Sequence, residues 1–173
     1  VYGWVFCAHQ VGAALAACPA WQTGCPAGGA AVAIWERNLA ANLEARNIRL
    51  TQQFVVNLVD EAIAEKMNLC AASLPPGENE LTHAGLTALA SEAVAPPRIA
   101  EAPASLECKH VSTLEIGENR LIIGEVLRVH VRDGVFDPQT WLIRPGTYAP
   151  IGRMQSPHWY CRTTEMFEMQ RPR

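Results

Sequence analysis

The feature that most constrains the fold of this chain is a pair of long alternating segments within residues 103–136. In the second segment the apolar residues share one parity and the basic residues take the other: Leu121, Ile123, Leu127, Val129 and Val131 against Arg128, His130 and Arg132. A period of two over a dozen residues is typical of a strand with one buried face, and Gly117-Glu118-Asn119 predicts a tight connection. Both segments exceed the usual length of a strand. The sequence therefore predicts a long β-hairpin.

The rest of the chain alternates short apolar runs with helical and loop segments. Composition and period predict strands at residues 1–8, 30–35, 54–59 and 160–169, helices at 38–50 and after Asp60, and a short helix or turn at 81–89. Residues 11–30 have no clear period, and residues 139–159 are expected to be mostly loop. At least six strands and two or three helices in a single domain, residues 1–173, predict a closed antiparallel barrel with peripheral helices, because closure removes exposed strand edges.

Composition argues against several classes of protein. Charged residues make up 18% and hydrophobic residues 49% of the chain, a balance that argues against disorder. The net charge of −3 and the pI near 6.0 argue against a general nucleic-acid-binding protein, which usually carries a basic surplus. No apolar run is long enough to span a membrane, and no signal peptide is visible. We therefore expect a folded domain that binds neither nucleic acid nor membrane.

The six cysteines contain no Cys-x-x-Cys pair, since they stand at positions 7, 18, 25, 70, 108 and 161. This spacing indicates neither a zinc knuckle nor a thioredoxin-like pair, and the five scattered histidines suggest no metal site. A chain of this length does not need a disulfide framework. We therefore expect free thiols and a cytoplasmic location, with Cys108 packed as a small hydrophobe. The chain opens at Val1 without Met, which leaves open what precedes it.

Five parts of the chain match, in order and spacing, the pattern of a known family. They are FVVNLVDEAIAEKMN, LPPGENE with AGLTAL, APPRIAEAPASLECKHV, IIGEVLRVHVRDGV, and PIGRM with WYCRTTEMFEM. Each part alone is ordinary strand or loop, but five in the same order are hard to attribute to coincidence. From about Arg46 to Pro172 the chain resembles the flavin reductase-like family of FMN-binding split barrels.

The resemblance implies both a fold and a chemistry. The long hairpin would belong to a six-stranded Greek-key split β-barrel with two or three peripheral helices, in the mostly β class. Two barrels would pair into a homodimer with FMN in a groove at the interface. Such proteins pass a hydride from NADH or NADPH to flavin, or hold FMN and pass its electrons to an acceptor, a monooxygenase component among them. Because the isoalloxazine ring carries the chemistry, the protein supplies orientation and hydrogen bonds.

The segment expected to bind the flavin phosphate departs from the family pattern. Where the family has Lys-Asp-Thr-Leu-x-Asn-Ile, this chain has Asn42-Leu43-Glu44-Ala45-Arg46-Asn47-Ile48, so that Glu44 replaces the Thr. A carboxylate repels a phosphate dianion and replaces a donor by an acceptor. Likewise LAACPAWQ replaces Asn-Leu-Ala-Pro-Tyr-Ser-Phe-Phe, which puts Leu15 and Ala20 at two polar positions. These changes support an alternative, a split-barrel protein that has lost flavin and uses the interface groove for another ligand or for cofactor-free chemistry.

The resemblance implies which residues along the chain would contact the cofactor. The expected residues are Ala20, Trp21, Trp35, Arg37, Arg46, Asn47, Asn57, Arg153 and Tyr160. Arg37 and Arg46 are placed to compensate for the lost phosphate contacts, because an Arg fork suits phosphate. Trp21 and Trp35 either stack on the flavin or fill the space that it would occupy.

Several residues have a structural alternative to the functional interpretation. Asn57 either contacts the flavin edge or forms a turn at the end of its strand. Arg153 either meets the phosphate or a pyrimidine oxygen, or is a solvated loop residue. His158 is either a proton donor or stacking partner at the catalytic centre, or a surface residue. Glu125 interrupts the apolar parity of its strand, so we expect an inward carboxylate whose partners link the barrel.

Overall fold

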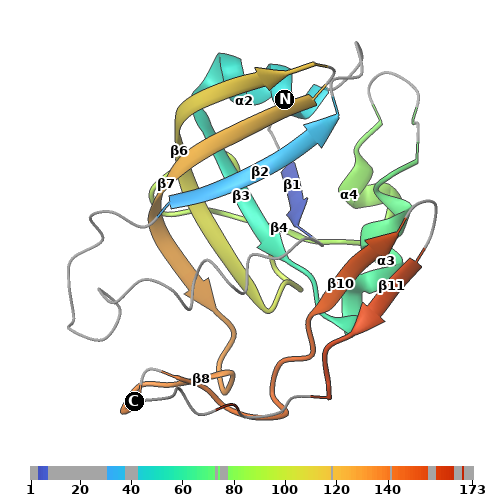
Figure 1. Ribbon diagram of the computed structural model, residues 1–173, viewed down its shortest axis with the longest axis vertical. Helices are drawn as coiled ribbons and strands as arrows, with labels where there is room; N and C mark the ends of the chain where they lie inside the picture. Colours follow the sequence, from blue (N-terminus) through green and yellow to red (C-terminus); the bar gives the residue numbers. More distant parts are fainter. Residues whose placement is uncertain are drawn as a thin grey trace.

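The structure is a computed structural model, shown in Figure 1. It describes residues 4–7, 31–37, 43–72, 74, 78–117, 119–140, 142–155, 159–165 and 169, with the backbone alone at 4–7, 31–37, 43–46 and 155. Strands dominate these residues, and the helices are few and short. None of the described helices has the length and apolar character needed to cross a membrane.

A five-stranded sheet forms the centre of the described fold, with its strands in the order β1-β3-β6-β7-β2. The bounds are β1 Trp4–Cys7, β2 Ala31–Arg37, β3 Gln53–Leu58, β6 Ala104–Ile116 and β7 Asn119–Val131. The sheet curls strongly around its interior, as Figure 1 shows. Three of its pairings are antiparallel, but β1 pairs with β3 in parallel. The expectation of an antiparallel barrel is therefore wrong at the first strand, because the long connection after β1 permits a crossover.

The long hairpin predicted from the alternating segments is confirmed as β6 and β7. Gly117 turns the chain with a φ of 59°, a conformation that glycine adopts without steric cost. The cross-strand register shifts twice, once beside Leu127 of β7 and once beside Val111 of β6. Each shift leaves one residue without a cross-strand partner, which is the definition of a β-bulge.

At the bulge of Leu127 the residues of β7 that face the core change from even-numbered to odd-numbered positions. The buried residues before it are Ile122, Gly124 and Val126. Beyond the bulge Val129 packs against the same core. The expectation that Leu121 and Ile123 belong to the buried parity is therefore wrong. One extra residue in a strand turns all the following side chains to the opposite face. The alternation of apolar residues in the sequence continues unchanged through the bulge, so it does not reveal that the buried face has changed.

The first hydrophobic core fills the concave side of the sheet and contains Ile48, Phe54, Val56, Leu58, Leu106, Cys108, Ile122 and Val126. Phe54 lies so close to Gly124 that a Cβ at position 124 would be 2.8 Å from the Phe54 Cε1 atom. Cys108 is fully buried, as expected for a small hydrophobe. Burial, with a smaller effect from the adjacent Glu107 carboxylate, raises the pKa of the Cys108 thiol to about 12. This cysteine is therefore an inert packing residue.

In the described part of the chain, four short helices accompany the sheet: α2 Leu43–Thr51, the 3-10 helix η2 Glu61–Ile63, α3 Ala64–Leu69 and α4 Glu80–His83. The helix predicted after Asp60 is confirmed as η2 and α3. Asp60 occupies the N-cap position, but its side chain makes no capping bond. Its Oδ2 atom instead accepts a hydrogen bond of 3.1 Å from Arg132 Nη2 at the end of β7. This ion pair ties the start of the helical segment to the hairpin.

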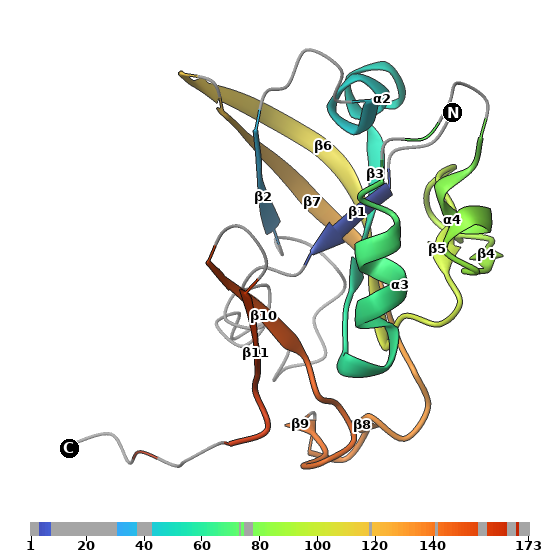
Figure 2. The ribbon, with the colours of Figure 1, turned by 90° about the vertical axis from the view of Figure 1, so that its right-hand side faces the viewer.

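A second core lies between the sheet and the helices and contains Val59, Ile63, Met67, Leu81, Ala84, Leu86, Ile99 and Ala102. The ribbon of β4 Ala88–Leu89 and β5 Arg98–Ile99 contributes to its edge. In Figure 2 the helices α3 and α4 stand on one side of the sheet, away from β2. The strand β3 is buried from Phe54 to Leu58, and the residue that follows it, Val59, belongs to the second core.

Two further ribbons lie in the C-terminal part: β8 Phe136–Asp137 with β9 Leu142–Ile143, and β10 Ile151–Gln155 with β11 Trp159–Arg162. Residues 139–159 were expected to be mostly loop, and this expectation is wrong for β9 and β10. The last strand also ends at Arg162, and residues 163–165 are not part of it. Short strands in isolated ribbons bury no continuous face, so they lack the alternating pattern that reveals longer strands.

A fully buried carboxylate, Glu107 of β6, joins β6, β7 and the segment before β5. It accepts hydrogen bonds from the amides of Glu92 (2.9 Å) and Ala93 (2.5 Å), and His130 Nε2 lies 2.5 Å from its Oε1 atom. Burial acts to raise the pKa of Glu107, but the two amides and His130 together outweigh it and lower the pKa. Glu125, expected as the inward carboxylate, is only half-buried. The fully buried carboxylate of the hairpin is Glu107, which lies on the face of β6 opposite Leu106 and Cys108 and is covered by the segment before β5.

Candidate functional site

The β10–β11 ribbon is attached to the end of β3 by backbone hydrogen bonds. The Ile151 amide donates to the Val59 carbonyl at 3.3 Å, and the Glu61 amide donates to the Ala149 carbonyl at 3.1 Å. An isolated bridge pairs Asp60 with the residue between these two bonds. The strand β10 therefore starts beside the first turn of η2, and the ribbon stands next to the helical segment.

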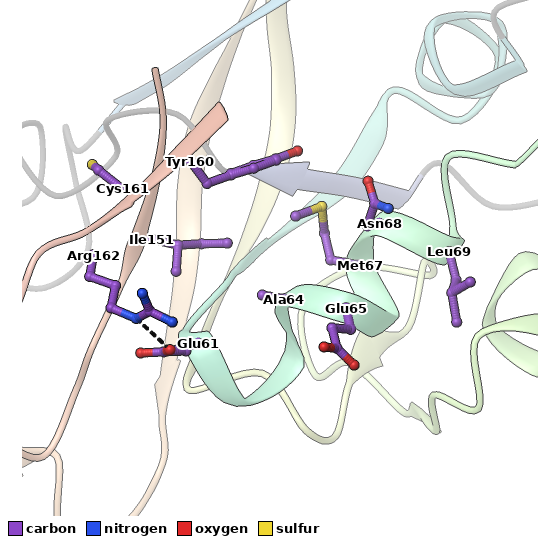
Figure 3. A pocket seen from close by; sticks show the side chains of 10 residues that line it. All are labelled: Glu61, Ala64, Glu65, Met67, Asn68, Leu69, Ile151, Tyr160, Cys161 and Arg162. Carbon is purple, nitrogen blue, oxygen red and sulfur yellow. Dashed lines mark hydrogen bonds and ion pairs between the residues drawn. The ribbon is translucent and has the colours of Figure 1, made fainter. Parts of the chain in front are cut away.

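A pocket of about 590 Å³ lies between this ribbon and the segment formed by η2 and α3. Its lining residues are Glu61, Ala64, Glu65, Met67, Asn68, Leu69, Ile151, Tyr160, Cys161 and Arg162. Figure 3 shows Tyr160, Ile151 and Met67 pointing toward one another across the pocket. At its edge Arg162 Nε donates to Glu61 Oε1 at 2.6 Å. The pocket thus has an apolar wall and a charged rim.

Two of the expected site residues, Arg153 and Tyr160, are brought together by the ribbon. They are cross-strand partners in β10 and β11. The Arg153 guanidinium carbon lies 5.8 Å from the centroid of the Tyr160 ring, which is the geometry of a cation–π contact. Arg153 is exposed and Tyr160 is half-buried. The prediction that they contact FMN stays a prediction, but Arg153 lies on a strand and not in a loop.

Asn57 lies inside β3 and is fully buried, so the alternative of a turn-forming residue is wrong. Its Oδ1 atom accepts hydrogen bonds from the Ile99 amide at 3.0 Å and from Ser105 Oγ at 2.9 Å. Its Nδ2 atom is buried and has no hydrogen-bond partner among the described residues. The structure therefore gives the Asn57 oxygen a role in holding β5 against β3 and β6, and the expected flavin contact remains a prediction.

Arg46 and Asn47 lie in α2. Asn47 is buried, and its backbone carbonyl accepts a hydrogen bond of 2.9 Å from Thr51 Oγ1 one turn later. Leu43 and Glu44 form the first turn of the same helix. The residue pattern that the family uses for phosphate thus falls on the N-terminal half of α2.

Trp35 and Arg37 lie near the end of β2, opposite Leu121 and Asn119 of β7. Only five residues separate Arg37 from the start of α2 at Leu43, so the end of β2 and the beginning of α2 are at most about 20 Å apart. The expected residues Trp35, Arg37, Arg46 and Asn47 are consequently grouped at one end of the sheet. Arg153 and Tyr160 belong to a separate ribbon.

Three expected residues, Ala20, Trp21 and His158, lie outside the described residues, as does Asn42. No cluster of three or more His, Cys, Asp or Glu side chains that could hold a metal ion occurs among the residues that the structure describes. Sequence reasoning did not identify the pocket beside Tyr160. The available signal was the spacing of Glu61, Glu65 and Asn68, which puts three polar side chains on one side of a helix next to the buried Met67.

Comparison with known proteins identifies the family. The family model described as "Flavin reductase like domain" matches residues 30–152 of this chain. A relative in Deinococcus radiodurans, an uncharacterized protein, is 38% identical over 128 residues, which make up 73% of this chain and 56% of the relative. The chain thus spans little more than half the length of this relative.

Two solved structures extend the comparison. The 2-nitrobenzoate 2-nitroreductase NbaA of Pseudomonas fluorescens is 30% identical with a TM-score of 0.73, over 83% of this chain and 70% of that one. The nitrilotriacetate monooxygenase component B of Bacillus cereus is 29% identical with a TM-score of 0.75, over 80% of this chain and 71% of that one. The matched family model, the shared fold and the curled sheet built on a long hairpin agree, and the chain belongs to the flavin reductase-like family of split-barrel proteins.

Proposed function

We propose that residues 1–173 form one domain of an FMN-binding oxidoreductase that takes a hydride from NADH or NADPH. Its electrons pass to free flavin or to another acceptor. The observation that carries the proposal is the match of the flavin reductase-like model over residues 30–152. The similarity to a monooxygenase component supports a partner monooxygenase as one acceptor. The thiols of Cys108 and Cys161, which form no disulfide, support a cytoplasmic location as part of the proposal.

The start of α2 is the proposed position of the FMN phosphate. The amides of its first turn carry a partial positive charge, which attracts an anion. Arg37 at the end of β2 and Arg46 within α2 are close enough in the chain to add a guanidinium contact. Glu44, in the first turn of α2, opposes the same phosphate. The backbone therefore fits a phosphate, and one side chain weakens the fit.

The ring of FMN would lie toward Trp35 and Trp21, with Asn47, Asn57, Arg153 and Tyr160 as further contacts. When bound, FMN supplies the hydride acceptor, and the protein orients it. These assignments rest on the family resemblance.

A homodimer is the proposed assembly, and the outer face of the hairpin supports it. We define this face by Leu114, Ile116, Leu121 and Ile123, which lie on the side of the sheet opposite the buried Ile122. Leu114 and Ile116 are each 50% exposed. Adjacent exposed apolar side chains on a strand pair are typical of a surface that another chain covers. A second copy is the proposed occupant.

Titration of the purified protein with FMN, followed by quenching of flavin fluorescence, tests the proposal. We expect saturable quenching at or below tens of micromolar FMN, and oxidation of NADH or NADPH when flavin is supplied. Protein that neither quenches FMN at these concentrations nor oxidises either nucleotide with excess flavin would contradict the proposal.

The change Glu44→Thr restores the residue type of the family at the proposed phosphate site. We expect FMN to bind more tightly by roughly 10- to 150-fold, since a charge-assisted contact is worth about 1.5–3 kcal/mol. The exposed Glu115, changed to Thr as the matched control, should leave FMN affinity unchanged. Equal FMN affinities of the Glu44→Thr and wild-type proteins would contradict the proposed position of the phosphate at the start of α2.

The second candidate function is a split-barrel protein that has lost flavin and uses the groove between two copies for another ligand or for cofactor-free chemistry. The position of Glu44 in the first turn of α2 favours it. The same titration separates the two candidates, because only the first predicts quenching that Glu44→Thr strengthens.

A further inference from the structure

We propose that the pocket between α3 and the β10–β11 ribbon is a second binding site, for a small aromatic cation such as an amidinium or an arylammonium. The pocket is separate from the proposed phosphate site: in Figure 2, α2 lies at the top of the molecule, and α3, β10 and β11 lie below it. Tyr160, which lines the pocket, is also one of the expected flavin contacts, so binding to the pocket is tested with no flavin present.

The walls of the pocket suit a flat apolar group. Met67 comes from the helix, and Ile151 and Tyr160 come from the ribbon, so two independent elements face each other across about 590 Å³. Met67 is itself almost buried, and Ile151 and Tyr160 pack against the second core, so the wall is held in place. A thioether opposite an aromatic ring is a favourable lining for an aromatic guest. The pocket is large enough for a single substituted ring.

The rim of the pocket sets the preferred charge of the guest. Glu61 and Glu65 lie four residues apart along the helical segment, and both line the pocket. Arg162 neutralises Glu61 through the ion pair of 2.6 Å. Glu65 is exposed and has no ion pair among the described residues. Among the residues that line the pocket, Glu65 therefore carries the one negative charge with no ion pair, and this charge attracts a cation and repels a carboxylate or phosphate. Arg153, which does not line the pocket, lies beside Tyr160.

The ring of Tyr160 already contacts a cation within the protein. Arg153 stands 5.8 Å from its centroid, so this ring accepts a cation. In the pocket, the aromatic part of a guest would lie against Met67, Ile151 and Tyr160, and its charge would be attracted by the Glu65 carboxylate. Asn68, also on the rim, adds an amide oxygen that can accept an N–H bond.

Benzamidine and benzoate are matched probes, since they share size and shape and differ in charge. Titration of the 15N-labelled full chain with each probe, followed by amide chemical shifts, measures affinity and location together. We expect benzamidine to shift amides at residues 64–69, 151 and 160–162, and to bind at least tenfold more tightly than benzoate. Equal binding of the two probes, shifts confined to other regions, or no binding of benzamidine at 10 mM would overturn the proposal.

Side-chain changes separate charge from shape. Glu65→Gln should weaken benzamidine binding about threefold, the size expected for one exposed charge pair. Glu78→Gln, which changes an exposed carboxylate outside the pocket lining, is the matched control and should have no effect. Glu61→Gln frees Arg162 and should raise benzoate affinity. If Glu78→Gln weakened benzamidine binding as much as Glu65→Gln, the attraction would be non-specific, and this result would contradict the proposal. Since no flavin is present in these titrations, their failure leaves the flavin proposal untouched.

Discussion

At the scale of single residues, Glu107 decides how three parts of the chain meet. Its side chain is fully buried, yet it receives two amide hydrogen bonds and one contact from His130. A buried carboxylate is tolerated only when donors replace the water that it loses. Arg128 and Glu92 form a further ion pair of 2.9 Å above it. The Glu107 carboxylate and the Arg128–Glu92 ion pair therefore hold the segment before β5 on the hairpin.

The change Glu107→Gln should destabilise the protein by about 3 kcal/mol at pH 7, because it removes the charge and puts an NH2 group against two amide donors. The folded state lowers the pKa of Glu107 below its ordinary value of 4.5, so its contribution is present above pH 4.5 and is lost as the pH falls below that value. Urea unfolding at pH 7 and pH 3.5 measures both effects. The difference between wild type and variant should shrink at pH 3.5. A pH-independent difference, or an equal loss in Glu115→Gln, would contradict this role.

A second residue-scale prediction concerns Gly124. The change Gly124→Ala puts a methyl group 2.8 Å from Phe54 Cε1, inside contact distance, and should cost about 1–3 kcal/mol of unfolding free energy. In a Phe54→Leu background the same change should cost less, because the smaller side chain leaves room. A double-mutant cycle by thermal or urea unfolding measures the coupling. Strict additivity would show that Phe54 is not what excludes the methyl group.

At the scale of elements, the sequence predicted the structures that depend on a single segment. It did not predict the features that depend on pairing with a second strand. The hairpin β6–β7 and the helical segment after Asp60 follow from periodicity within single segments. The bulge at Leu127 depends on the register between two strands, so the alternation of β7 alone could not reveal that its buried parity changes. For the same reason Glu125 was expected inward. Glu107 was not recognised because its burial depends on contacts with the Glu92–Ala93 segment, which is distant in the sequence. The parallel pairing of β1 with β3 is likewise set by a distant partner.

The attachment of β5 is an element-scale prediction. Asn57→Leu removes the acceptor for the Ile99 amide, which should then exchange with solvent roughly 10- to 30-fold faster, as expected for a lost buried bond of about 1.5–2 kcal/mol. Hydrogen exchange at Ile99 measures this opening. Ser105→Ala removes only the second donor to Asn57 and should leave exchange at Ile99 close to that of the wild type. Unchanged exchange in Asn57→Leu would mean that the second core, and not Asn57, holds β5.

At the scale of the whole molecule, the resemblance over residues 46–172 predicted the family, and the matched family model confirms it. The candidate site could be predicted only in part. Short motifs identify Arg153 and Tyr160, and the structure brings these two together, whereas the pocket between α3 and the ribbon arises from packing of separate elements. The outer face of the hairpin also could not be predicted, because only the register between β6 and β7 shows which apolar residues are exposed.

The proposed homodimer gives a whole-molecule prediction. Leu114→Lys puts a charge in the centre of the outer face and should weaken self-association about 30-fold or more, since burial of an unpaired polar group costs about 2 kcal/mol or more. Leu142→Lys, at a 65% exposed position of β9, is the matched control and should leave association unchanged. Sedimentation velocity over a range of concentrations measures both. Wild-type protein that is monomeric at all concentrations would contradict the homodimer itself.

The strand order has a consequence for the newly synthesised chain. β2 finds its partner only after more than 80 further residues have been made, because Arg37 lies opposite Asn119. During that interval the apolar segment AVAIW has no strand beside it, and unpaired apolar strands are where nascent chains associate wrongly. We expect the hairpin β6–β7 to close first, because it is built from neighbouring segments, and β2 to join its edge afterwards. Slower translation of residues 38–118 would therefore lengthen the time in which this protein is prone to aggregate, without altering a single contact of the finished fold.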